Sequence, residues 1–96
     1  MKLTQLSYFF EGYNFPSLRH LYPTNTDLWN AFNRQEGPSV RQDLVHEIHW
    51  LQQRNEEEQQ QVMQYLNQVG IMGPIRFQEV HNMLQFLDEM KKNIAL

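Results

Sequence analysis

Apolar residues recur every three to four positions through the second half of the chain, which is the spacing of one buried face of an α-helix. The first stripe consists of Val40, Leu44, Ile48 and Leu51, with Val45 beside it. The second stripe consists of Val62, Met63, Leu66 and Val69. The third stripe consists of Val80, Met83, Leu84, Leu87, Met90 and Ile94. This pattern predicts three regular helices within residues 38–96.

Short polar residues indicate where the first two of these helices begin. Ser39 with Gln42, and Asn55 with Glu58, each form a capping-box pattern. In such a box a short side chain, and a Gln or Glu three residues later, bind free N–H groups at the start of a helix. A single helix over 39–70 is the alternative, because the apolar spacing almost permits it. That helix would carry Asn55 and Glu58 on its apolar seam, so we prefer a break near Arg54.

Glycine and proline mark the remaining boundaries. Gly70 is expected to end the second helix in the left-handed conformation that glycine adopts readily. Pro74, which follows Gly73, suits the first position of a helix because its missing N–H needs no partner there. The last helix is therefore expected to begin at about residue 74.

The first 37 residues are less regular, and their apolar spacing predicts only short helices. These are a helix over about 3–12, one turn over 17–22, and a helix that starts at a polar cap within 24–26. Large aromatic side chains bury much area, so most should pack in the core, with one or two tyrosines exposed. The alternative is a platform for a partner. The aromatic residues of this segment are Tyr8, Phe9, Phe10, Tyr13, Phe15, Tyr22, Trp29 and Phe32.

Length and composition set the fold class. A chain of 96 residues, of which 41% are hydrophobic and 20% are charged, is sufficient for one small globular domain. None of the predicted elements is a strand. The expected fold is therefore all-α, a single-domain bundle of four or five short helices spanning residues 1–96.

The composition also excludes several classes of function. The chain has no cysteine, which rules out disulfides, thiolate catalysis and cysteine-bound zinc. A cysteine-free chain fits the reducing cytoplasm, where we place the protein. No apolar stretch is long enough to cross a membrane, and residues 1–10 are too polar for a signal peptide.

Residues that might support catalysis or metal binding are few. His46 and His49 lie three positions apart, whereas the helical metalloprotease motif needs two histidines four apart, and no third ligand is evident. We therefore expect two surface histidines and no bound metal. The sequence contains no nucleophile elbow, phosphate-binding loop or cofactor motif. The prediction is a protein that is not an enzyme and that needs no cofactor.

Trp50 is the strongest candidate for a functional residue. On a helical wheel it lies roughly 150° from the centre of the stripe that contains Ile48. Its neighbours on that side are His46, Asp43 and Arg54. A tryptophan among polar residues is typical of a binding hot spot. The alternative is that the aromatic N-terminal segment folds over Trp50 and buries it.

Acidic residues extend this candidate surface. Glu56 and Glu57 open the helix after Asn55, where the helix dipole favours negative charge, and they also offer an acidic surface to a basic partner. The whole chain has 8 basic and 11 acidic residues, a net charge of −3. These features predict a non-enzymatic protein-binding module. In its sharpest form it is a small acidic inhibitor, comparable with an immunity protein or an antitoxin, that blocks a basic partner. The predicted partner-binding residues are Trp50, His46, Asp43, Arg54, Glu56 and Glu57.

A helix-turn-helix-like DNA-binding protein that uses a helix over 75–93 is the alternative. Polar residues that could read base edges share one face of this helix. Only Lys91 and Lys92 are adjacent cations, and the arginines are scattered, so few groups would contact phosphate. Nucleic acid is therefore the less favoured partner. The polar face consists of Gln78, His81, Asn82, Gln85 and Lys92.

Overall fold

The computed structural model describes residues 1–96 and contains helices but no strands, which confirms the all-α class. Six helices are present, one more than the upper limit expected, because the single turn α2 forms a helix of its own. In chain order they are α1 (Thr4–Gly12), α2 (Leu18–Leu21), α3 (Asn25–Gln35), α4 (Pro38–Gln52), α5 (Glu56–Val69) and α6 (Val80–Asn93).

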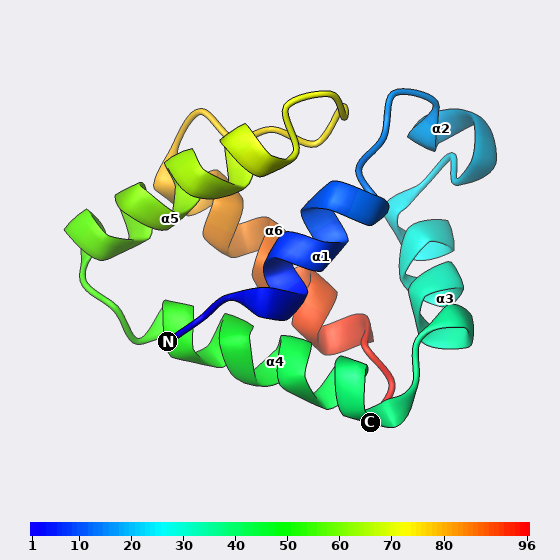
Figure 1. Cartoon of the computed structure of the whole chain (residues 1–96), viewed down its shortest axis with the longest axis horizontal. Helices are drawn as coiled ribbons and strands as arrows, with labels where there is room; N and C mark the ends of the chain where they lie inside the picture. Colours follow the sequence, from blue (N-terminus) through cyan, green and yellow to red (C-terminus); the bar gives the residue numbers. More distant parts are fainter.

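Five of the helices pack together around one core. Figure 1 shows α1 in front of α6, with α4 along the lower edge, α5 at the upper left and α3 at the right. α1 packs against α4 and α5, and α6 packs against α3, α4 and α5. The predicted apolar stripes face inward, and 19 buried apolar residues form one continuous core. This arrangement leaves one side of each long helix exposed to solvent.

The aromatic N-terminal segment supplies the middle of that core. The Phe9 ring lies 5.2 Å from the Phe10 ring, 5.9 Å from the Phe32 ring and 6.1 Å from the Trp29 ring, measured between centroids. All four side chains are almost fully buried. The interpretation of most of these residues as core is therefore confirmed, and Tyr8 is the tyrosine of the segment that remains exposed.

The predicted break near Arg54 is also confirmed. α4 ends at Gln52, and α5 begins at Glu56. Asn55 caps α5, because its Oδ1 accepts a hydrogen bond of 2.8 Å from the backbone N–H of Glu58. The predicted cap at Ser39 is wrong. Gly37 is the N-cap of α4 and Pro38 its first residue, so Ser39 already lies inside the helix.

Replacing Asn55 with alanine should lower the free energy of unfolding by about 1 kcal/mol, the usual cost of losing an N-cap side chain. Urea denaturation of both proteins measures this difference. Asn82, an exposed residue within α6, provides the control, because its replacement with alanine removes no cap. An Asn55→Ala protein as stable as the parent would show that the cap contributes nothing to α5.

Two predicted helix boundaries near residues 70–80 are wrong, the conformation of Gly70 and the first residue of the last helix. Gly70 ends α5 with φ of −97°, not in the left-handed conformation. Glycine is required there by close packing, since a Cβ would lie 2.7 Å from the Asn14 amide nitrogen. α6 begins at Val80 rather than at Pro74. The intervening segment is not helical, and Asn67 holds it in place: its amide accepts from the N–H of Phe77 at 3.0 Å and donates to the Phe77 carbonyl at 2.7 Å.

Candidate functional site

The fold brings Trp50 and Arg54 together. Trp50 lies on the last turn of α4, and Arg54 follows the end of that helix. The Arg54 guanidinium carbon lies 4.9 Å from the centre of the Trp50 ring, in a cation–π contact. Trp50 is half-buried and packs against the edge of the core. Its ring is therefore partly exposed to solvent, with the Arg54 cation beside it.

The other predicted residues of α4 lie on its solvent side. Asp43 is seven positions before Trp50, and His46 is four before it, so both share the exposed flank of the helix with Trp50. Asp43 and His46 are both exposed. These two residues, Trp50 and Arg54 thus form one strip along α4.

Glu56 and Glu57 are exposed in the first turn of the next helix. The molecule contains two ion pairs, His81–Glu79 and Lys92–Asp88. Asp43, Glu56 and Glu57 therefore have no intramolecular cation as an ion-pair partner. A surface with an aromatic residue and unpaired carboxylates can attract a cationic partner over a longer distance than neutral groups do.

Glu47, on the same helix, has a structural role that the sequence analysis missed. It is buried, and its carboxylate accepts hydrogen bonds of 3.0 Å from the backbone N–H groups of Gln5 and Leu6. It thereby satisfies the start of α1, where Leu3 offers no capping side chain. Burial raises the pKa of Glu47, although the two backbone donors act in the opposite direction. A long-range cap of this kind leaves no spacing pattern in the sequence.

Two clefts flank α5, and neither was predicted. One, of about 430 Å³, lies between the N-terminal segment and α5 and is lined by Leu3, Val62 and Tyr65 among others. The second, of about 460 Å³, lies between the first turns of α5 and α6. Glu56, one of the predicted site residues, lines this second cleft. The sequence analysis missed this cleft because it expected 74–79 to be helical, whereas this segment is a non-helical connection between α5 and α6.

The structure places His46 and His49 on the exposed side of α4. No group of three or more His, Asp or Glu side chains lies close enough together to hold a metal ion. No helix is long and apolar enough to cross a membrane.

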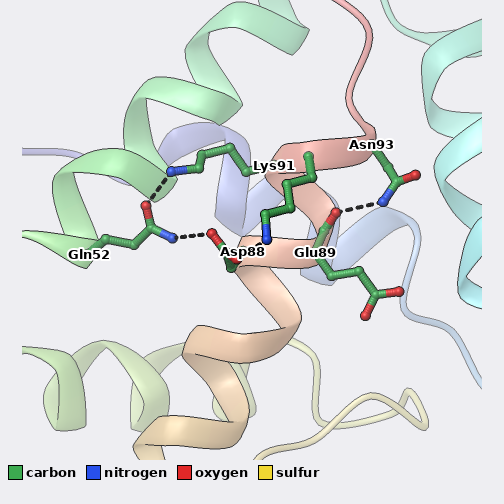
Figure 2. Close-up of polar contacts among 6 residues, drawn as sticks. Gln52, Asp88, Glu89, Lys91 and Asn93 are labelled. Atoms are coloured by element: carbon green, nitrogen blue, oxygen red, sulfur yellow. Dashed lines mark hydrogen bonds and ion pairs between the residues drawn. The ribbon is translucent and has the colours of Figure 1, made fainter.

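The polar face of α6, which is the alternative DNA-binding surface, differs from the prediction in its extent. Gln78 lies outside α6, so the helix over 75–93 is shorter than expected at its start. Both lysines of α6 contact polar side chains, and Figure 2 shows the contact of Lys91 with Gln52. Lys92 pairs with Asp88 at 3.0 Å, and Lys91 donates to Gln52, whose amide nitrogen also bonds Asp88. The contacts from Lys92 and Gln52 hold the pKa of Asp88 below its ordinary value.

Three comparisons with known proteins gave no match: no protein-family model, no curated protein and no solved structure matches this chain.

Proposed function

We propose that this protein is a non-enzymatic binding module that recognises a basic partner protein through the surface formed by Trp50, Asp43, His46, Arg54, Glu56 and Glu57. In this role it resembles a small acidic inhibitor, immunity protein or antitoxin that covers a cationic surface of its partner. The absence of cysteine is the reason for placing this interaction in the cytoplasm.

The observation that carries the proposal is the combination at the α4–α5 corner of a half-buried Trp50, fixed by Arg54, with carboxylates that have no intramolecular cation. A tryptophan ring already held in place loses little conformational freedom on binding, which is one reason that such residues act as hot spots. Unpaired carboxylates at the rim attract a basic partner and speed association. The net charge of −3 acts in the same direction.

Trp50→Ala should weaken binding to the partner by at least about 2 kcal/mol, the threshold of a hot spot. The partner is first obtained by affinity purification and mass spectrometry and is then titrated by calorimetry. Tyr65, an exposed aromatic residue outside this surface, provides the control as Tyr65→Ala. Equal losses for the two variants would contradict a surface centred on Trp50. Circular dichroism of the Trp50 variant must retain the parent's helical signal, because an unfolded variant would place Trp50 in the core and remove the proposed site.

Reversing Glu56 and Glu57 to lysine should slow association and reduce its dependence on salt, with a smaller effect on dissociation. Stopped-flow measurements at two ionic strengths test this.

An electrophoretic shift with duplex DNA at the same two salt concentrations tests the alternative function. A DNA complex that survives the higher salt concentration, without any protein partner, would replace the present proposal.

A further inference from the structure

The cleft between α5 and α6 is open to solvent and has a mixed lining. Glu56 and Glu79 supply carboxylates, one from the first turn of α5 and the other from the residue before α6. Val80 and Leu84 supply the apolar part of its wall. A ligand for this cleft must therefore combine an apolar portion with a group that is compatible with two negative charges.

Gln59 contributes a third acceptor, and it is the best buried of the polar residues in the cleft. The residue is 8% exposed, and its Nε2 donates to the backbone carbonyl of Leu51 at 3.1 Å. Because a carbonyl oxygen can only accept, the amide nitrogen has to face Leu51. Oε1 of Gln59 is then left without a donor from the protein. This oxygen is not sealed from solvent, so it is open to a ligand that donates a hydrogen bond.

The charges in the cleft are not balanced by the protein itself. Glu56 takes part in no ion pair, and Glu79 pairs only with His81, at 3.1 Å, a contact that is ionic only when the imidazole is protonated. No lysine or arginine lines the cleft. An anionic ligand would meet two like charges there. A metal ion is disfavoured as well, because no three His, Asp or Glu side chains gather closely enough to hold one.

We propose that this cleft receives a lysine or arginine side chain of the basic partner. The aliphatic stem packs on Val80 and Leu84, while the cationic head donates to Glu56, Glu79 and the free amide oxygen of Gln59. Long basic side chains combine these two properties, an apolar stem and a charged end with several donors. The inference rests on the proposed function, because Glu56 belongs both to the proposed partner-binding surface and to this cleft. It adds a specific binding position for one basic side chain of the partner.

Short peptides provide a test that needs no knowledge of the partner. The protein labelled with ¹⁵N is titrated with acetyl-Gly-Arg-Gly-amide, with the lysine analogue, and with the analogue that carries citrulline, a neutral isostere of arginine. Amide signals of Gln59, Val80 and His81 should shift and saturate with a cationic peptide, and they should not shift with citrulline. Glu56→Gln and Glu79→Gln should each weaken binding about fivefold, the upper range for one partly exposed charge pair.

Glu89→Gln is the matched control, because it removes the same charge from α6 at an exposed position outside the cleft. Figure 2 shows its carboxylate without a partner among the residues drawn. If Glu89→Gln and Glu79→Gln weakened peptide binding equally, the peptide would be responding to the overall negative charge of the protein rather than to the cleft. That result would overturn the proposal. Equal shifts with arginine and citrulline would overturn it too. The proposal for the cleft would also be overturned if Trp50→Ala weakened binding of the partner and Glu79→Gln did not. That result would leave the proposed function standing. Specific peptide binding, in a protein whose complex is unaffected by Trp50→Ala, would support the cleft and contradict the Trp50 surface.

Discussion

Replacing Asn14 with alanine is expected to lower the free energy of unfolding by about 3 to 4 kcal/mol, since a buried N–H or C=O left unpaired costs about 1 to 3 kcal/mol. The Asn14 side chain accepts from the Ile75 N–H at 2.9 Å and donates to the Ile75 carbonyl at 2.9 Å and the Gly70 carbonyl at 3.2 Å. It is itself buried. In the variant both backbone groups of Ile75 lose their partner, whereas the Gly70 carbonyl still accepts from Gly73.

Urea denaturation measures the loss, with Asn82→Ala as the control. Asn82 is exposed on α6, and its replacement should change stability by no more than about 0.5 kcal/mol. If Asn14→Ala were as mild as Asn82→Ala, water would have to satisfy the Ile75 groups in place of the amide. Hydrogen exchange at the Ile75 amide separates the two cases, because an unprotected N–H exchanges at the rate of local opening rather than of global unfolding.

Glu47→Ala is expected to cost about 2 to 3 kcal/mol, because it leaves the N–H groups of Gln5 and Leu6 without an acceptor at the buried start of α1. Glu47→Gln should cost much less. Both N–H groups reach the same oxygen, Oε1, at 3.0 Å, so a single amide oxygen can serve them. The contrast between the two variants separates the hydrogen bonds of this carboxylate from its charge.

The charge of Glu47 should appear as a dependence of stability on pH. Burial raises its pKa above the ordinary value of 4.5, despite the backbone donors, and Asp43 raises it further. An acid whose folded-state pKa is raised binds its proton more tightly in the folded state. Its stabilising contribution is therefore complete below the unfolded-state pKa and is lost as pH rises through the folded-state pKa.

Compared with Glu47→Gln, the parent protein should thus lose stability as pH rises from about 4.5 towards neutrality. Denaturation of the two proteins at intervals across this range gives the difference directly. A difference that stays constant would show that the hydrogen bonds from α1 fully offset the burial of the charge. A difference of opposite sign would show that they exceed it, and that Glu47 acts as a conventional stabilising cap.

The sequence alone determined the helices that depend on local signals. The stripes of α4, α5 and α6 are visible because a helix buries residues at a fixed period whatever it packs against. Asn55 was found as a cap because its partner, the N–H of Glu58, is three residues away. The burial of Phe9 and Trp29 was also predicted, because large aromatic side chains in a small chain have few other places to go.

Tertiary structure decided the features whose partners are distant in the chain. Asn14 holds Ile75 from 61 positions away, and Glu47 caps α1 from 42 positions away. Such contacts leave no periodic trace. Residues 74–79 were therefore expected to be helical, whereas Asn14 and Asn67 bind the backbone of this non-helical segment. The cleft lined by Glu56, Gln59 and Glu79 also joins distant parts of the chain, since it lies between α5 and the start of α6. Local spacing therefore specified the helices of this protein. Hydrogen bonds from side chains to backbone groups far away in the sequence specified how those helices pack and which residues share a surface.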